Sequence, residues 1–584
     1  MVGPAYDFLE NPLGAVRLTF EKAISVDPTP LEGKDWGTAE LFRHFLYDES
    51  LIAKVPIINQ KNLYRIPPKT LVRFRGMIQD MLDNEIYVGV YKDGEVWKTT
   101  KYSDVPQFIG ESMRDMRLWE RRLLHCVSIP GISTWANDSA EEAVERYMDL
   151  MSIQREKRSR MVMEGKADEV SFEDSEKLPC AKKLRDEDNL SSEGASSALS
   201  SPGMESSSLP VLLEASNDPL SCSVKIYDSP VPDFKINEVY EFVGILNFES
   251  NVDHNELDEF DGMPIDSPIS KGPCLHCIVH KRLGLKDFVS SLPFSEPKFN
   301  IVRDVREALL SHLTSVIGND GLAGHYMLLH LLSTIHARVD NIAVGKLSLN
   351  LSKFDRERVS VFGYSLEVVL KSLLPITERI PLTLEYLNTA SLSPKKDYQL
   401  GRLLPGALQL VEGSHLLIDE TRLDTGTLNS VGVENVRSLK YLVESQKVEY
   451  DFTYYKIEMP ADVQVLILSD GKSNIFPADV VLPFHPSCEF SLHLPVTEET
   501  WNAWRWYLAS TRSMPHSIDP GMKEVVEKDL VAARQADRSL NCEDLSRWMT
   551  MGRLIAASYG DTNLKMEHWQ LVKEMERLRT ERLR

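Results

Sequence analysis

Two adjacent acidic residues, Asp419 and Glu420, are the strongest candidates for chemistry in this sequence. They follow the apolar run LLI, at positions 416–418. An apolar strand that ends in an acidic pair suits phosphoryl transfer, because the first carboxylate can hold Mg²⁺ and the second can orient an attacking water. Strands that end in Asp-Glu are also common without this role, so the pair alone does not establish an active site.

A nucleotide site also needs a phosphate loop, and the only candidate is GNDGLAGHYMLLHLL (318–332). Its glycines Gly318 and Gly321 precede an apolar helix. The lysine that reaches the phosphates would fall at Gly324, and the hydroxyl residue that binds Mg²⁺ would fall at His325. A helical run leads almost directly into the glycines, without a clear strand. The segment is therefore either the relic of a phosphate loop or a turn between two helices.

Three further residues, Cys274, Cys277 and His280, have the types found in zinc sites. The segment CLHCIVH alternates as a strand does, and no second Cys/His pair is nearby, so we expect no metal here. The sequence contains no G-x-S-x-G motif and no Cys-His pair suited to nucleophilic catalysis. We therefore expect no catalytic residue, no cofactor and no small-molecule substrate.

The first half of the chain has the pattern of short β-strands after a helical start (1–60). Strands are expected at 71–82, 85–91, 95–102, 121–131, 223–228 and 238–248. Short strands at this spacing predict a small OB-like barrel built from 61–164 and 221–298. Between these parts, 165–220 is rich in Ser, Glu and Asp and lacks an apolar face, which predicts a disordered loop.

The second half changes to alternating helices and strands. Helices are expected at 304–317 and 325–339, and strands at 347–352, 415–420 and 463–469. Near-continuous apolar runs are typical of buried parallel strands, so 299–496 predicts an α/β domain. Residues 497–584 predict a helical lid. The expected fold class is mixed α/β, with several domains.

The acidic composition limits the kinds of partner that the protein is expected to bind. A net charge of −21 opposes binding to bare nucleic acid, since neutralising phosphates needs a basic surface, and it suits basic protein partners. Seven scattered cysteines fit a reducing compartment. No stretch approaches about 18 uninterrupted apolar residues, and the first residues do not form a signal peptide. We expect a soluble intracellular protein without membrane contact.

The acidic pair lies in a longer segment that resembles a known ATPase motif. PGALQLVEGSHLLIDE (405–420) is similar to the Walker B region of MCM helicase subunits, which carry AAA+ domains. The other parts of such a domain match poorly. SDGKSN (469–474) departs from a sensor segment, VVLPFHP (480–486) lacks an arginine finger, and the sensor arginine would fall at Glu543 or Ser546.

Outside 165–220, nearly the whole chain is identified as a member of the MCM-binding protein family (mini-chromosome maintenance complex-binding protein), from a plant. Six segments carry this resemblance: NPLGAVRLTF (11–20), VPIINQKNLYRIPPKTLVRFRGMIQDMLDNEIYVGVY (55–91), SIPGISTWA (128–136), EVYEFVGILN (238–247), HYMLLHLLSTIHARVD (325–340) and GALQLVEGSHLLIDET (406–421).

The resemblance implies a non-catalytic nuclear protein that binds MCM helicase subunits in DNA replication. It implies remodelling, unloading or chaperoning of the MCM ring and support of sister-chromatid cohesion, with only indirect association with chromatin. It also implies a degenerate AAA+-like domain after the OB-like barrel, with relic residues Asp419, Glu420, Gly318, Gly321, Gly324 and His325. The resemblance assigns no partner-binding residue to this sequence. Basic clusters at 156–160 and 181–185 could serve nuclear import.

Two alternative functions stay open. An ATPase with an unusual phosphate loop would use Asp419 and Glu420. A barrel that binds single-stranded nucleic acid would stack bases on aromatic side chains among cations. Its candidate residues are Phe74, Tyr87, Tyr91, Trp97, Lys92, Lys98 and Lys101.

Overall fold

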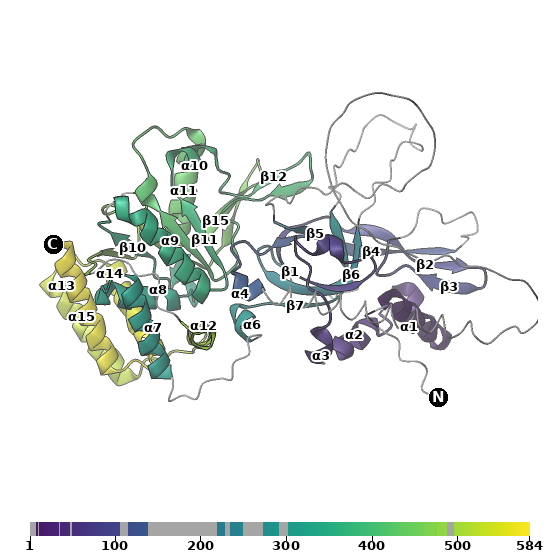
Figure 1. Ribbon diagram of the computed structural model, residues 1–584, viewed down its shortest axis with the longest axis horizontal. Helices are drawn as coiled ribbons and strands as arrows, with labels where there is room; N and C mark the ends of the chain where they lie inside the picture. The colour runs from purple at the N-terminus through teal and green to yellow at the C-terminus, as the bar shows by residue number, and fades with distance from the viewer. Residues whose placement is uncertain are drawn as a thin grey trace, which may run out of the picture. The chain divides into compact units, whose positions relative to one another are not determined.

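Four β-sheets and the helices around them make up the described part of the chain, which confirms the mixed α/β class (Figure 1). The computed structural model describes residues 8–9, 11–33, 35–46, 49–104, 115–137, 219–227, 234–248, 272–290, 302–354, 356–473, 475–487 and 496–584. The predicted disordered loop, except Pro219 and Leu220, and both basic clusters lie outside these residues. No helix within the described ranges is both long and apolar enough to cross a membrane.

The N-terminal helices form because the chain supplies their caps and their apolar faces. Helix α1 (Pro12–Val26) begins with proline, and the Asn11 side chain accepts from the Gly14 amide at 2.9 Å. A 3₁₀ turn (Thr29–Glu32), α2 (Thr38–Leu46) and α3 (Glu49–Ile52) follow. Phe20 and Phe42 of these helices are buried in one cluster with residues of the barrel.

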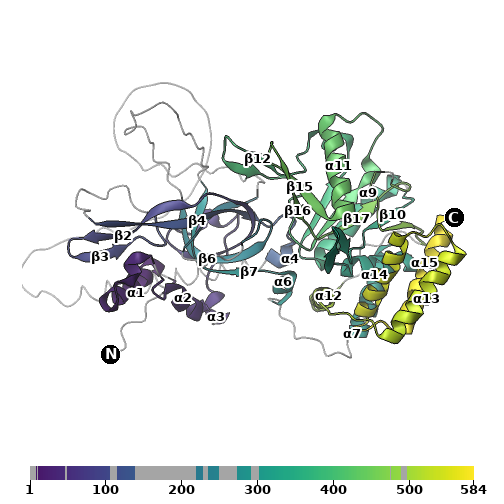
Figure 2. The ribbon, with the colours of Figure 1, turned by 180° about the vertical axis from the view of Figure 1, so that it is seen from behind.

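Seven strands form the first sheet, and five of them close on themselves. The strands are β1 (Leu71–Met81), β2 (Glu85–Asp93), β3 (Val96–Thr99), β4 (Met116–Ser128), β5 (Ser221–Ile226), β6 (Val239–Phe248) and β7 (Pro273–Arg282). Their order is β1-β6-β7-β5-β4-β2-β3, and the extra pairing of β1 with β4 closes a five-stranded barrel (Figure 2). Strands that precede and follow 138–218 in sequence therefore share one barrel.

The barrel needs a close approach of backbones at β6 and β7. The register of this pair shifts between Val243 and Gly244, which marks a bulge. A Cβ atom at Gly244 would lie 2.2 Å from the carbonyl oxygen of His276, so only glycine fits there. Beyond the closed ring, β2 and β3 extend from β4 next to α1 (Figure 1).

A second sheet of five parallel strands forms the centre of the α/β part. Its order is β11-β14-β17-β10-β18. The strands are β10 (Leu349–Ser352), β11 (Thr377–Pro381), β14 (Ser414–Asp419), β17 (Val463–Leu468) and β18 (Val480–Pro483). Both faces are covered, because Leu417 and Leu466 lie in one apolar cluster while Leu416 and Val465 lie in another.

Helices and small hairpins surround this sheet. The helices are α6 (Leu285–Ser290), α7 (Val302–Val316), α8 (Gly321–Leu332), α9 (Arg356–Leu373), α10 (Leu384–Thr389) and α11 (Ser430–Ser445). The outer strands are β8 (Ala337–Val339), β9 (Ile342–Val344), β12 (Lys395–Asp397), β13 (Arg402–Leu404), β15 (Lys447–Asp451) and β16 (Lys456–Pro460). The helix expected to reach residue 339 ends at Leu332 instead, because 337–344 forms a hairpin.

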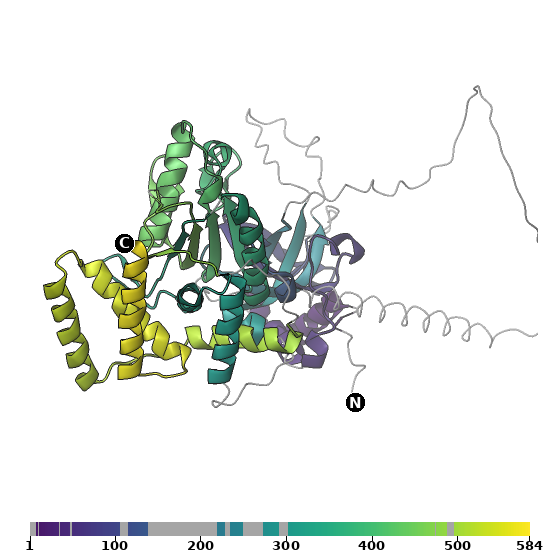
Figure 3. The ribbon, with the colours of Figure 1, turned by 60° about the vertical axis from the view of Figure 1, so that its left-hand side comes forward.

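The C-terminal region is helical, as its sequence predicts. It contains α12 (Glu498–Arg512), α13 (Pro520–Ala536), α14 (Cys542–Ser558) and α15 (Met566–Leu583). Helix α14 begins with a capping box in which Asn541 and Asp544 bond each other's amides. Helices α14 and α15 pack against each other and against α8; Figure 3 shows these C-terminal helices in yellow.

Candidate functional site

The predicted acidic pair lies where the sequence placed it, at the carboxyl end of β14, but Asp419 is fully buried in an ion pair. Arg379 of β11 donates to its Oδ2 at 2.8 Å, and the Thr421 hydroxyl donates to its Oδ1 at 2.6 Å. Arg379 also bonds Glu367 of α9 at 3.1 Å. Burial opposes the charge of Arg379, yet the two carboxylates outweigh it and raise its pKa. We call these four residues the Asp419 cluster.

Glu420 differs from its neighbour, because no cation of the described ranges pairs with it. It is partly buried, and its Oε2 atom has no hydrogen-bond partner among the described residues. Burial raises the pKa of Glu420, and the nearby charge of Asp470 adds to this effect. The pair therefore combines a carboxylate neutralised by arginine with one that burial makes easier to protonate.

The Asp419 cluster suits packing better than Mg²⁺ binding. The guanidinium of Arg379 already lies beside the oxygen that would face a metal ion. Like charges about 4 Å apart repel by about 4 kcal/mol per pair of unit charges at an effective dielectric constant of about 20. A divalent cation would have to displace Arg379, which would then lose its contact with Asp419 and keep only that with Glu367.

The glycines considered as a relic phosphate loop lie in a turn between α7 and α8, which is the second of the two alternatives that the sequence left open. No strand precedes them. Gly318 ends α7 with φ +61°, and Gly321 begins α8. Gly324 is needed for helix packing, since a Cβ atom there would lie 2.3 Å from the hydroxyl of Thr314. His325 bonds the carbonyl of Gly321 at 2.9 Å.

The amino end of α8 is already occupied by an acidic side chain. Asp320 accepts from the amide of Ala323 at 3.1 Å and caps the helix. Both of its oxygens also accept from Arg582 of α15, at 2.6 and 2.8 Å. These bonds lower the pKa of Asp320 although burial alone would raise it. A phosphate would meet this carboxylate rather than free amides.

A phosphate loop at the carboxyl edge of the sheet would have to join a strand to the next helix. Only residues 353–355 lie between β10 and α9, and the sequence there is Lys-Phe-Asp. Phe354 is buried in the apolar core. This connection is too short for the eight-residue motif and contains no glycine.

The remaining sensor-like positions hold no free arginine. His485 uses its amide to bond Asp320, and Glu543 and Ser546 lie on α14 as expected. The neighbouring Arg547, which the sequence analysis did not consider, bonds the buried Glu576 at 2.9 Å and the carbonyl of Asp479 at 3.2 Å. Asn474 lies outside the described residues.

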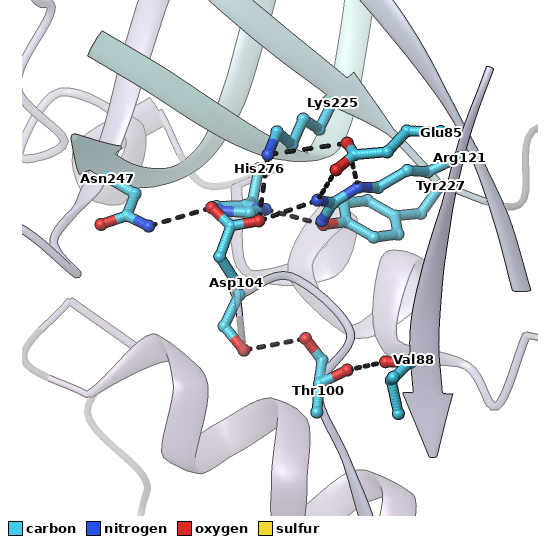
Figure 4. A network of polar contacts seen from close by, with 10 residues as sticks. Glu85, Val88, Thr100, Asp104, Arg121, Lys225, Tyr227, Asn247 and His276 are labelled. Atoms are coloured by element: carbon cyan, nitrogen blue, oxygen red, sulfur yellow. Dashed lines mark hydrogen bonds and ion pairs between the residues drawn. The ribbon is translucent and has the colours of Figure 1, made fainter. Parts of the chain in front are cut away.

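A second group of charged residues, which sequence spacing does not indicate, lies on the outer face of the barrel wall, opposite to the barrel core. Asp104 accepts from Arg121 at 2.8 Å and from Lys225 at 3.0 Å, and it lies 3.2 Å from His276 (Figure 4). Glu85 binds the same Arg121 through two bonds of 2.9 Å. Burial opposes the charge on Asp104, but the three cationic or donor groups hold its pKa below the usual range.

Two polar residues complete this Asp104 network. Tyr227 accepts from Arg121 at 2.8 Å and contacts the Nδ1 atom of His276 at 2.7 Å, and Asn247 donates to Asp104 at 3.1 Å (Figure 4). Five of the seven residues lie on five different strands, β2, β4, β5, β6 and β7, while Asp104 and Tyr227 lie in the segments after β3 and β5. No sequence spacing relates them. The two carboxylates, Glu85 and Asp104, balance the charges of Arg121 and Lys225. The network therefore carries no net charge when His276 is neutral.

The Cys/His segment of β7 divides its candidate ligands between the two faces of the strand. Cys274 and His276 face Asp104, and one ligand atom of each lies within 4.8 Å of the others. Cys277 lies on the opposite side of the strand, in the barrel core. Lys225 and Arg121 already neutralise Asp104, which disfavours a metal ion at this cluster.

The aromatic residues proposed for nucleic-acid stacking are mostly core residues. Phe74 and Tyr87 are buried, and Lys101 is buried over the ring of Trp36 at 4.4 Å. Lys98 is exposed but pairs with Asp93. Phe74 and Tyr87 are therefore unsuited to stacking on bases, whereas Tyr91 and Trp97 of the β2–β3 hairpin are partly exposed.

Comparison with known proteins assigns the family. The family described as mini-chromosome maintenance replisome factor matches residues 42–583. The mini-chromosome maintenance complex-binding protein of Arabidopsis thaliana is 52% identical over 599 residues, with 100% of both chains covered. The proteins of the same name from Salmo salar and Homo sapiens are 31% and 30% identical, each with 99% of this chain and 98% of the relative covered. The chain therefore belongs to the mini-chromosome maintenance replisome factor family.

Proposed function

We propose that this protein binds subunits of the MCM helicase through protein–protein contacts. The observation that carries the proposal is similarity along the full chain to proteins named mini-chromosome maintenance complex-binding protein. The acidic net charge of −21 suits a protein partner with basic surfaces. The proposed place of action is the nucleus, in DNA replication.

The proposed activity does not include nucleotide hydrolysis. Three structural observations support this part. Arg379 neutralises Asp419, Asp320 and Arg582 occupy the amino end of α8, and the link between β10 and α9 has only three residues. Phosphoryl transfer depends on a phosphate cradle with a lysine and on a held Mg²⁺, and no group in these places supplies either.

The proposed mechanism is mimicry of a helicase subunit. In this account the closed barrel is OB-like, the five-stranded parallel sheet is a degenerate AAA+-like core, and α12 to α15 form its lid. The order of barrel, parallel sheet and helices along the chain supports it. Surfaces that join neighbours in the ring would then join this chain to one subunit. Competition for that interface would loosen, unload or chaperone the ring and so support sister-chromatid cohesion.

The test is size-exclusion co-elution of the full chain with purified MCM subunits and subcomplexes, with and without ATP. We expect stable co-elution with at least one of them. The variant Glu420→Gln provides a matched control, because it alters the other acid of the Asp-Glu pair without removing an ion pair of the described residues, and it should leave co-elution unchanged. A folded chain that co-elutes with no subunit or subcomplex contradicts the proposal.

A further inference from the structure

One region of this acidic chain is basic throughout. Residues 51–79 contain six basic side chains and no acidic one: Lys54, Lys61, Arg65, Lys69, Arg73 and Arg75. Arg73 and Arg75 lie on β1 and pair with Glu241 at 3.7 and 2.8 Å. Lys61, Arg65 and Lys69 are exposed. The segment that leads into the barrel therefore presents three cations to solvent.

An exposed aromatic ring lies among these cations. Tyr64 is 75% exposed, and its ring stacks on that of Phe248 with centroids 6.3 Å apart and planes 12° apart. One face of Tyr64 is thus supported by the last residue of β6. The rest of the ring is accessible from solvent.

The segment that carries Tyr64 is held in place by buried neighbours and by hydrogen bonds. Its neighbours Leu63 and Ile66 are buried in the barrel core. Asn62 donates to the carbonyl of Ile57 at 2.8 Å and accepts from the amide of Asn59 at 2.8 Å. A ligand that stacks on Tyr64 would therefore meet a surface that is already ordered, and little conformational entropy would be lost.

The backbone brings the three cations near the ring. Lys61 and Arg65 flank Tyr64 in sequence, and the Leu63–Arg65 segment is a 3₁₀ turn. Lys69 lies near Phe248, because its amide donates to the carbonyl of Leu246 at 2.7 Å. We call Lys61, Tyr64, Arg65, Lys69 and Phe248 the Tyr64 platform.

We propose that the Tyr64 platform binds single-stranded nucleic acid. A base stacks on the accessible part of the Tyr64 ring while Lys61, Arg65 and Lys69 contact the phosphates on either side. An acidic peptide would satisfy the cations but would not use the open ring. This contact is independent of the proposed binding to MCM subunits, and it would add a direct nucleic-acid contact to any association through them.

The affinity should be modest and sensitive to salt. The net charge of −21 opposes the approach of a polyanion, so we expect a Kd on the order of 10⁻⁵ M at low salt. Three phosphate contacts predict a slope of about −2 in a plot of log K against log salt concentration, at about −0.7 per contact on a single strand.

Fluorescence anisotropy with a labelled oligothymidylate longer than about 16 nucleotides tests this proposal. Tyr64→Ala should weaken binding about tenfold, since stacking contributes about 1–3 kcal/mol per base. The double variant Arg65→Glu and Lys69→Glu should weaken it further and reduce the salt slope by about 1. Circular dichroism spectra should match the wild type, because the three side chains are exposed.

Two matched controls separate the platform from general effects. Tyr454→Ala removes another exposed tyrosine, 86% exposed, at the tip of the β15–β16 hairpin. Lys523→Glu with Lys528→Glu makes the same change in net charge on α13. Neither control should alter binding by more than about twofold. Equal losses in the controls, no saturable signal at about 50 mM salt, or binding of polyglutamate without binding of the oligonucleotide would each overturn the assignment.

Discussion

The carboxylate of Asp419 lies at the end of β14 with its two oxygens divided between a guanidinium and a hydroxyl. The sequence places an acid there, but it does not show that Arg379, forty residues earlier, would be its partner. At the residue scale, the chemistry of this position is therefore set by β11, which pairs with β14 in parallel and brings Arg379 to the same edge of the sheet.

Replacing Asp419 with Ala should destabilise the protein by about 2 kcal/mol, because it leaves the partly buried Arg379 with Glu367 as its remaining carboxylate partner. Arg422→Ala is the matched control, since Arg422 is half-exposed and lies 3.8 Å from Asp419. It should change the free energy of unfolding by less than about 0.5 kcal/mol. Urea denaturation measures both. A loss below about 1 kcal/mol for Asp419→Ala would show that the ion pair is not structural.

A buried histidine pair predicts a dependence of stability on pH. His330 and His415 are fully buried with their Nε2 atoms 3.1 Å apart, and His330 also bonds the carbonyl of Leu347 at 2.7 Å. Burial lowers the pKa of both imidazoles, that of His330 to about 4. Between pH 6.5 and 4 the unfolded chain therefore binds protons that the native chain does not bind. The free energy of unfolding falls as the pH falls through this range.

The size of this effect can be isolated by one variant. From pH 7.5 to 5.5, a histidine with this shift should lower the free energy of unfolding by roughly 1 kcal/mol. Replacing His415 with Leu removes one such group and should reduce the pH slope, whatever its effect at pH 7.5. Groups other than the directly bonded His330 keep their surroundings in both proteins, so the difference in slope reports the histidine pair. Parallel pH profiles for the two proteins would refute this assignment.

At the element scale, strands with continuous apolar runs were predictable and short connections were not. The runs at 415–420 and 463–469 became β14 and β17, at the centre of the parallel sheet. The turn at 318–321 was compared with a phosphate loop because glycines and an apolar helix occur in both. A phosphate loop follows a strand, whereas this turn follows helix α7. The helical sequence pattern before Gly318 already indicated the second arrangement.

The connection after β4 ties the barrel part of the chain to β11. Ile132 pairs with Ile376, the Thr377 amide donates to the carbonyl of Gly131 at 2.8 Å, and the Ser133 hydroxyl donates to the carbonyl of Leu374 at 2.6 Å. Gly131 has φ +67°, and a Cβ atom there would lie 2.8 Å from the oxygen of Thr377. The backbone conformation and the close approach both require glycine.

Gly131→Ala should therefore destabilise the protein by about 2 kcal/mol and lower its melting temperature. Gly471→Ala is a control in open space, since no atom lies within 4 Å of its added Cβ, and it should be close to neutral. Differential scanning fluorimetry compares the two. An unchanged melting temperature for Gly131→Ala would mean that this connection does not hold β11 in solution.

Helix α15 is held at its carboxyl end by one ion pair. Arg582 bonds both oxygens of the fully buried Asp320 and so joins α15 to the start of α8. Arg582→Ala should cost about 2–3 kcal/mol in stability. Arg577→Ala should have little effect, because Arg577 is exposed and pairs only with acids on its own helix. Equal unfolding midpoints in urea for the two variants would rule out this role of Arg582.

At the scale of the whole molecule, the sequence predicted the kinds of parts and their order. Barrel strands, parallel strands and terminal helices could be assigned because each has its own apolar period. The sequence could not reveal that the Asp104 network gathers seven residues from separate strands and connecting segments, since that depends on how the barrel closes. It also could not reveal which rings face outward, and for that reason Phe74 and Tyr87 were chosen as stacking residues and Tyr64 was not.

The composition of a purified complex tests the proposed subunit mimicry most directly. The full chain would be mixed with assembled MCM hexamers, and native mass spectrometry would count the subunits in each species. We predict species in which one copy of this chain is present and one helicase subunit is missing. Intact hexamers that carry the chain as an addition, with every subunit retained, would contradict replacement of a subunit.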